Sequence, residues 1–269
     1  MTAKPARILI IAGSDSSGGA GVQADIKTAT AFGAYAMTAI TAVTAQDTTG
    51  VGAIQAIPAE IVREQIVRCL SDIGADAVKT GMLANADSVH AAAEELAARA
   101  QHIPIVVDPV LASTSGHALG DDDVVDAIRS ALLHHATLVT PNLPEAERLC
   151  GFPLATGDDL RRAGATLLDL GATAVLLKGG HGGSDTVTDL LFTRDSDPRA
   201  YIAKRVDTVH THGTGCTLAT AIACGLGQGM ALGDAIQRAH DFVQRAIRTA
   251  PGFGAGSGPI NHLTLLDAP

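Results

Sequence analysis

The sequence predicts an α/β fold, a three-layer α/β/α sandwich whose central sheet is mostly parallel and carries an antiparallel pair at one edge. Short apolar runs alternate with longer amphipathic stretches through residues 7–177. Such alternation of strands and helices builds parallel sheets with helices on both faces. After residue 185 the rhythm changes, because two strand-like runs follow each other across a polar turn, as in an antiparallel pair.

The expected strands are the apolar runs of the chain. In order they cover 7–12, 36–43, 77–79, 104–107, 137–140 and 174–177, and the edge pair covers 186–192 and 201–206 around the polar turn 194–199. No change of composition and no linker divides the sequence, so we expect a single domain that spans residues 1–269.

Local signals set several of the helix ends. Pro58 stands at a helix start, whereas Gly33 and Gly74 stand just past helix ends, where these residue types are favoured. Carboxylates fill the first turn of the helix that starts at residue 121, as the helix dipole favours. The expected helices cover 21–32, 58–73, 87–100, 121–133, 144–149, 157–170, 213–225 and 233–249.

The composition excludes several classes of function. The chain has 19 Lys and Arg against 28 Asp and Glu, a formal net charge of −9, which argues against a basic nucleic-acid-binding surface. Aromatic residues make up 3% and Trp is absent, so base-stacking platforms and a membrane belt are not expected. No apolar run approaches the ~20 residues of a membrane span. With no signal-peptide pattern and no zinc-like cysteine spacing, we expect a reduced cytoplasmic protein.

A glycine-rich segment follows the first strand and leads into a helix. It covers Gly13–Gly21, and glycine there lets the backbone approach a ligand closely while the helix N-terminus favours an anion. It fits neither common phosphate motif: Ala20 follows Gly19 where a P-loop needs Lys, and Asp15 stands where a dinucleotide fingerprint needs Gly. An ordinary flexible turn stays open as the alternative.

Oxygen ligands and a lysine follow the next strands. Asp108 ends one apolar strand, and Asn142 and Glu145 come just past the following strand. This donor set suits Mg²⁺, which keeps several waters and bridges phosphates, although Asn-x-x-Glu also makes an ordinary helix cap. Lys178 ends another strand beside Gly179, and it is either a phosphate contact or a solvated lysine.

The strongest local signal opens the helix near residue 213. Gly213, Thr214, Gly215 and Cys216 present consecutive backbone N–H groups without bulky side chains between them, which suits one anion and a phosphoryl group in transfer. Cys216 lies in the same positive field, so we expect its thiol pKa to be lowered. Thr214 or Thr217 is an alternative helix cap.

Four segments together resemble the hydroxymethylpyrimidine/phosphomethylpyrimidine kinases, in the vitamin-kinase branch of the ribokinase-like superfamily. They cover 11–21, 140–146, 178–181 and 211–217, and the similarity runs from about residue 8 to residue 262. The resemblance implies a MgATP-dependent enzyme of thiamine biosynthesis. Such an enzyme phosphorylates 4-amino-5-hydroxymethyl-2-methylpyrimidine and then converts the monophosphate to the diphosphate.

The resemblance also implies roles for named residues. The pyrimidine pocket would be lined by Gly13, Asp25, Gln46, Met82 and Val110. The metal would be held by Asp108 and Glu145, and ATP would be bound by Lys178, Asn142 and Thr214. The anion hole would be formed by Gly213, Gly215 and Cys216, with Cys216 either taking the acceptor's proton or shaping the hole. The resemblance further implies a homodimer.

Two departures and two alternatives accompany the resemblance. Asp47 stands where relatives often carry Asn, and the loop after Val110 offers Thr114 where many carry Lys, so one expected cation is missing. A pyridoxal kinase is the main alternative, because that branch shares the Gly-Thr-Gly-Cys motif. A non-catalytic pyrimidine-binding protein on a kinase scaffold is the alternative from another class.

Overall fold

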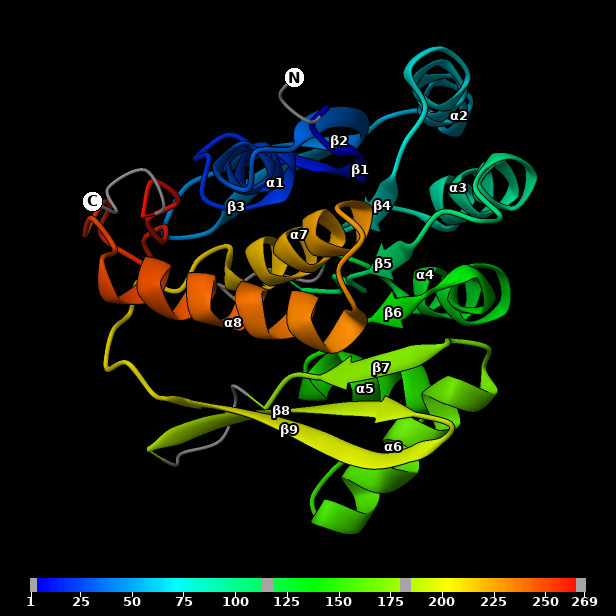
Figure 1. Cartoon of the computed structure of the whole chain (residues 1–269). Helices are drawn as coiled ribbons and strands as arrows, with labels where there is room; N and C mark the ends of the chain where they lie inside the picture. Colours follow the sequence, from blue (N-terminus) through cyan, green and yellow to red (C-terminus); the bar gives the residue numbers. More distant parts are fainter. Residues whose placement is uncertain (1–3, 113–118, 180–184, 265–269) are drawn as a thin grey trace.

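A computed structural model describes residues 4–112, 119–179 and 185–264, and all of its strands join one sheet (Figure 1). Across the sheet the strands run in the order β3-β2-β1-β4-β5-β6-β7-β8-β9. Their bounds are Arg7–Asp15 (β1), Tyr35–Gln46 (β2), Val51–Ala56 (β3), Ala77–Thr80 (β4), Ile105–Val107 (β5), Leu138–Val139 (β6), Ala174–Leu177 (β7), Thr186–Thr193 (β8) and Ser196–Lys204 (β9).

Helices cover both faces of the sheet, as the predicted three-layer sandwich requires. Figure 1 shows α1, α7 and α8 on one face and α2 to α6 on the other. Their bounds are Gly21–Ala31 (α1), Ala59–Arg68 (α2), Ala86–Arg99 (α3), Asp122–Ala127 (α4), Leu143–Cys150 (α5), Gly157–Asp169 (α6), Thr214–Gly227 (α7) and Leu232–Arg248 (α8). The predicted helices 58–73 and 121–133 end in the π-helical turns Cys69–Ile73 and Ile128–Leu132.

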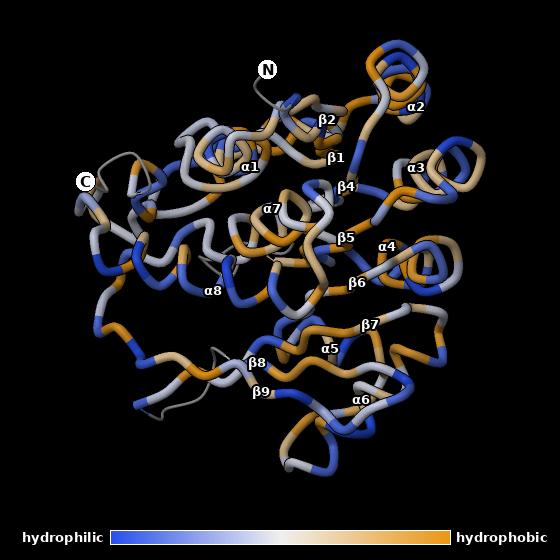
Figure 2. The backbone as a smooth tube through the Cα atoms, in the orientation of Figure 1, coloured by the Kyte–Doolittle hydropathy of each residue, from blue (hydrophilic) through white to orange (hydrophobic). Residues whose placement is uncertain are grey.

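Alternating side chains divide the core into two layers. Leu9 and Ile11 of β1 pack toward α2 and α3, whereas Ile8 and Ile10 pack toward α1, α7 and α8. Because successive side chains of a strand point to opposite faces, a strand buried on both faces is apolar throughout. Figure 2 shows this as orange strands between helices that are orange on one side and blue on the other.

The antiparallel edge was predicted on one side, but the structure has antiparallel strands on both. β8 and β9 form the predicted pair, and β8 also runs antiparallel to β7. On the opposite edge, β3 (Val51–Ala56) pairs antiparallel with β2 and was not predicted. Most of β3 is exposed and it includes Gly52, so it lacks the apolar run that marks a buried strand. From β2 to β7 in the sheet order, each strand runs parallel to its neighbour, as predicted.

Several strands extend beyond their predicted bounds, and β1, β2 and β9 do so by three or more residues. β1 reaches Asp15, with a register shift between Ala12 and Ser14, so the first part of the glycine-rich segment is strand. β9 begins at Ser196, inside the predicted polar turn, because an edge strand open to solvent accepts polar side chains and Pro198. The first extension matters for function, because it brings Gly13 to the carboxyl end of the sheet.

Candidate active site

One cavity of about 860 Å³ lies at the carboxyl ends of the parallel strands and the N-terminus of α7. In an open α/β sheet this is where ligands bind. The cavity brings together all of the predicted site residues except Asp25, and these are Gly13, Gln46, Met82, Asp108, Val110, Asn142, Glu145, Lys178, Gly213, Thr214, Gly215 and Cys216. Of the other motif residues, Thr114, Gly180 and His181 lie outside the described residues.

Asp25 does not line the cavity, contrary to its predicted place in the pyrimidine pocket. The Asp25 side chain is fully buried, and its Oδ2 accepts a hydrogen bond from Lys79 Nζ at 2.8 Å. Its Oδ1 accepts a second hydrogen bond from the Thr220 hydroxyl at 2.7 Å. A buried carboxylate needs such partners, and here they hold it beneath the cavity floor.

The N-terminus of α7 is built for an anion. Gly213 has φ +86 and caps the helix, and a Cβ at this position would collide with the Gly19 carbonyl oxygen. Only glycine meets both demands, which fixes the glycine-rich segment against this helix start. No acidic residue lies in the first turn of α7, and the first N–H groups of a helix have no acceptor inside it. These groups therefore face the cavity with a net positive field.

Lys178 joins the carboxylates to this helix end. Its Nζ lies 2.9 Å from Asp108 Oδ1, which also accepts a hydrogen bond from the Thr140 hydroxyl. A Cβ placed on Gly215 would stand 3.3 Å from the same Nζ. Burial alone lowers the pKa of Lys178, but the charges of Asp108 and Glu145 raise it above its usual value. The lysine is therefore a fixed cation beside the first turn of α7.

Asn142 and Glu145 form a complete capping box. The Asn142 side chain accepts from the Glu145 N–H, and the Glu145 carboxylate accepts from the Asn142 N–H, each at 2.9 Å. The helix cap is thus confirmed, and the Glu145 carboxyl, which also accepts from the Leu111 N–H, still lines the cavity. Burial raises the pKa of Glu145 to about 7, against the opposing charge of Lys178. The Glu145 carboxyl can therefore gain or lose a proton near neutral pH.

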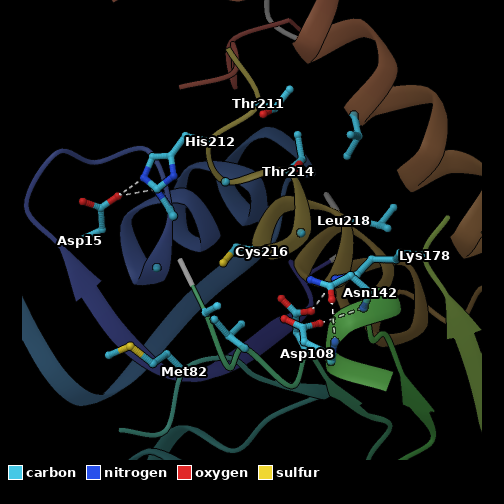
Figure 3. A pocket seen from close by; sticks show the side chains of 18 of the residues that line it. Asp15, Met82, Asp108, Asn142, Lys178, Thr211, His212, Thr214, Cys216 and Leu218 are labelled. Atoms are coloured by element: carbon cyan, nitrogen blue, oxygen red, sulfur yellow. Dashed lines mark hydrogen bonds and ion pairs between the residues drawn. The ribbon is translucent and has the colours of Figure 1, made fainter. Parts of the chain in front are cut away.

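The thiol of Cys216 differs from its expected state. Burial raises the pKa of Cys216 to about 11, and the charge of Lys79 and a hydrogen bond from the Gly21 N–H only partly oppose it. The predicted lowering by the helix N-terminus is therefore wrong, because removal of the thiol from water outweighs the helix field. Figure 3 shows Cys216 between the Asp108–Lys178 cluster and a second pair of side chains.

That second pair, Asp15 and His212, was missed by sequence reasoning. His212 Nε2 lies 2.8 Å from Asp15 Oδ2, and both side chains are buried in the cavity wall (Figure 3). The Gln46 amide lies 3.4 Å from the same ring nitrogen. Burial alone raises the pKa of Asp15, yet hydrogen bonds from His212 and from Ser17 lower it to about 2. The available signal was Asp15 itself, the acidic residue inside the glycine-rich segment.

A further wall of the cavity was also missed. It comes from β8, the segment after β9, and helices α7 and α8. Its lining mixes apolar side chains with polar ones, and these are Val187, Val206, Leu218, Val243 and Ile247 with Asp189, Arg205, Thr208, His240 and Gln244. The residues of this wall lie far apart in the sequence, and the apolar patterns of their strands and helices predict only a buried core. Such a lining offers a ligand both apolar contacts and hydrogen-bonding groups.

Two arginines line the cavity, although the sequence indicated that one cation of the family, a lysine in the loop after Val110, is missing. Arg148 and Arg205 both contribute to its lining. Arg148 also donates to the Gly120 carbonyl and to Asp122, which ties α5 to the start of α4. The cavity therefore has more positive side chains than the motifs alone indicated.

Comparison with known proteins identifies the family. A profile of the family described as phosphomethylpyrimidine kinase matches residues 15–261. The chain is 46% identical over 258 residues to a hydroxymethylpyrimidine/phosphomethylpyrimidine kinase of Streptomyces coelicolor, covering 96% of this chain and 94% of that protein. It is 42% identical to the Bacillus subtilis enzyme of the same description, over 95% of this chain and 94% of that protein.

Solved structures confirm the ribokinase-like fold. An ADP complex of a Bacillus subtilis pyridoxal kinase superposes with a TM-score of 0.89 at 34% identity, covering 98% of this chain and 99% of that one. A phosphomethylpyrimidine kinase from Clostridium difficile superposes with a TM-score of 0.79 at 37% identity, covering 90% and 99%. Together, the profile match, the near full-length relatives and the cavity show that the chain belongs to the phosphomethylpyrimidine kinase family.

Proposed function

We propose that this protein is an ATP-dependent kinase of thiamine biosynthesis. It phosphorylates 4-amino-5-hydroxymethyl-2-methylpyrimidine and then converts the resulting monophosphate to the diphosphate. The observation that carries the proposal is one continuous cavity, which joins Gln46 and Met82 at one end to Lys178 and the glycine-rich start of α7. The family match and the described activities of the relatives agree with it.

We assign the pyrimidine ring to the end of the cavity lined by Gly13, Gln46, Met82 and Val110. The Gln46 amide has both donors and an acceptor, which suit a ring nitrogen and an exocyclic amine. A Cβ on Gly13 would stand 2.5 Å from the Met82 methyl group, so a side chain there would displace the wall of a flat pocket. A polar pocket of this kind rejects analogues that leave its groups unpaired.

We assign the ATP phosphates to Lys178, Asn142, Thr214 and the N–H groups at the start of α7. The acceptor's hydroxyl oxygen attacks the γ-phosphorus while the bond from that phosphorus to the ADP oxygen breaks. Such a transfer has a loose transition state, so positioning and charge stabilisation supply most of the catalysis. We assign the adenine base to the wall of the cavity that includes Val187 and Ile247.

We assign Cys216 to shaping the anion site rather than to accepting the proton. Its pKa of about 11 means that the thiol is protonated near neutral pH. A loose transfer demands little from a base, because the hydroxyl proton is acidified only late. The proton of the acceptor hydroxyl then leaves to a phosphate oxygen or to water.

Asp108 and Glu145 fit a magnesium ion bound together with the phosphates. Asp108 Oδ2 accepts no hydrogen bond from the described residues, and the Glu145 carboxyl accepts only from the N–H groups of Asn142 and Leu111. Each carboxylate oxygen has two lone pairs, so both side chains keep acceptor capacity for a cation. The described residues contain no cluster of three or more His, Cys, Asp or Glu that could hold a metal by itself. Mg²⁺ typically takes one or two carboxylates and completes its shell with waters and phosphate oxygens. When bound, it would neutralise charge on the phosphates.

Pyridoxal is the second candidate acceptor, because the structural neighbours include a pyridoxal kinase solved with AMP-PCP and pyridoxal at a TM-score of 0.88. The test compares kcat/KM for the hydroxymethylpyrimidine, its monophosphate and pyridoxal under the same MgATP concentration. We expect kcat/KM to be higher for both pyrimidines than for pyridoxal. A higher kcat/KM for pyridoxal would reverse the assignment of the acceptor.

We also propose that the protein works in the cytoplasm as a homodimer. The described residues contain no helix that is long and apolar enough to cross a membrane. The dimer rests on the resemblance to the family, and sedimentation of the purified protein tests it directly.

A further inference from the structure

Lys79 is a buried lysine that no part of the proposed reaction uses. It lies on β4, its side chain is fully buried, and it is among the largest fully buried side chains of the described residues. Its Nζ donates to Asp25 Oδ2 at 2.8 Å. Removing a lone ammonium from water is costly, so a lysine in this position requires its carboxylate partner.

The ammonium lies directly behind the cavity floor. A Cβ on Gly81 would stand 2.8 Å from Lys79 Nζ and 3.1 Å from the Ala12 Cβ. Ala12 and Met82, the next residue after Gly81, both line the cavity. Only a residue without a side chain at position 81 therefore leaves room for the ammonium under this floor.

The ion pair is anchored to the helix that carries the anion site. Asp25 belongs to α1, and its second oxygen accepts from Thr220 of α7 at 2.7 Å. Cys216 precedes Thr220 by four residues, so both lie on the same face of α7, one turn apart. The pair thus sits one turn below the thiol, on the side of α7 that faces the sheet.

The ammonium has hydrogen-bonding capacity left over. An –NH₃⁺ group carries three donors, and within the described part of the chain Lys79 has one acceptor, Asp25. Burial lowers the pKa of Lys79, but the charges of Asp25, Cys216 and Asp108 and the hydrogen bond to Asp25 together raise it above its usual value. Lys79 is therefore a permanent cation with donors that are not committed to Asp25.

We propose that Lys79 is a positioning residue for phosphoryl transfer: its ammonium, anchored through Asp25 to α7, sets a fixed positive charge beneath the helix start where the transferred group passes. This inference rests on the proposed kinase function. Preorganised charge in a site without water stabilises developing negative charge at no reorganisation cost. Lys79 contacts no reacting atom and acts through the floor and α7.

The thiol of Cys216 provides a built-in reporter of this charge. The charged groups that act on it are Lys79 of β4, Asp25 of α1, Asp108 after β5 and Lys178 after β7. The lowering effect of Lys79 on the thiol pKa exceeds the raising effect of Asp25. Changing the two partners in turn should therefore move the thiol pKa in opposite directions.

The experiment measures the pH dependence of Cys216 alkylation by iodoacetamide, resolved from the other cysteines by peptide mass spectrometry. Asp25→Asn leaves the cation without its partner, so the thiol should titrate about one pH unit lower than in the wild type. Lys79→Met combined with Asp25→Asn removes both charges without leaving a lone buried carboxylate. In that double variant the thiol should titrate above the wild-type value.

Steady-state kinetics of the double variant test the effect on the reaction. We expect kcat to fall about tenfold or more, while KM for ATP changes less than about threefold, because the charge acts mainly in the transition state. Thr28→Val, which removes another buried hydroxyl from α1, controls for general damage to the helix and should leave the thiol titration in place. Thermal unfolding checks that each variant is folded, and Asp25→Asn alone keeps the thiol test available if the double variant is not.

Two results would overturn the proposal. The first is a thiol that titrates at the wild-type pH in both variants, or moves in the same direction in both. The second is a shifted thiol titration with an unchanged kcat, which would mean that the charge does not reach the reaction. The thiol titration needs no substrate, so failure of the kinase assignment, recognised as a wild-type protein that phosphorylates no acceptor, is a separate outcome.

Discussion

At the scale of single residues, the Asp15–His212 pair links two walls of the cavity that are far apart in the sequence. Asp15 accepts hydrogen bonds from Ser17 and from the Ala20 N–H, so it also fixes the glycine-rich turn. His212 directly precedes Gly213, whose backbone closes against Gly19. The Asp15–His212 pair therefore fixes the glycine-rich segment, which lines the proposed pyrimidine pocket, against the start of α7.

The depressed pKa of Asp15 makes a prediction about stability. Because this pKa falls from 3.8 to about 2 on folding, the ionised carboxylate contributes about 2 kcal/mol above pH 4, which is lost as the pH falls toward 2. Asp15→Asn should lower the free energy of unfolding at pH 7 by about that amount, and the difference from the wild type should shrink below pH 4. Urea unfolding at several pH values measures it, with the exposed Asp197→Asn as control. A difference that stays constant down to pH 2 would contradict the assignment.

The protonated state of Cys216 makes a second prediction at this scale. If the thiol only shapes the anion site, Cys216→Ala should lower kcat less than about tenfold, whereas loss of a proton acceptor costs about 10²–10⁴-fold. Cys216→Ser nearly preserves the shape of the side chain, so its kcat should be closer still to that of the wild type. The rate should show no titration of this group between pH 6 and 9, because its pKa is about 11. A hundredfold loss in both folded variants would restore Cys216 as the base.

At the scale of elements, the start of α5 serves structure and chemistry with the same two residues. The capping box of Asn142 and Glu145 satisfies N–H groups that the helix itself cannot. It also holds the Glu145 carboxyl at the cavity, close to Lys178 and Asp108. The sequence left a cap and a metal ligand as alternatives, and the geometry allows both at once.

Glu145→Gln separates these two roles. Glutamine at this position still completes a capping box, so the melting temperature should stay close to that of the wild type. The Mg²⁺ concentration for half-maximal rate should rise about tenfold, because a charged ligand is lost. With a pKa of about 7, the wild type should need more Mg²⁺ as the pH falls from 8 to 6, and the variant should lose this dependence. An unchanged Mg²⁺ requirement in the variant would remove Glu145 from the metal site.

At the scale of the whole molecule, the sequence predicts best those features that produce a recognisable pattern within a short segment. The parallel strands and the residues at their carboxyl ends were predicted, because apolar runs and the glycines at 213 and 215 are visible without partners. The edge strand β3 left no such mark, since its side chains are mostly exposed. Asp25 was misplaced because its burial depends on Lys79, a partner 54 residues away. We further propose that the chain is one folding unit, since a single sheet runs through it.

The net charge of −9 gains a meaning at this scale. The cavity contains positive groups, which are Lys178, Arg148, Arg205 and the start of α7, with Lys79 beneath the floor. It also contains the carboxylates of Asp15, Asp108, Glu145 and Asp189. An acidic protein that binds a polyphosphate needs fixed positive groups at the binding site, because the rest of its surface repels the ligand.

The most direct test of the kinase assignment is a product time course with the purified protein, MgATP and 4-amino-5-hydroxymethyl-2-methylpyrimidine, followed by chromatography and mass spectrometry. We predict that the monophosphate appears first and is then converted to the diphosphate, with one ADP released for each phosphoryl group transferred. A folded protein that forms neither product would contradict the assignment.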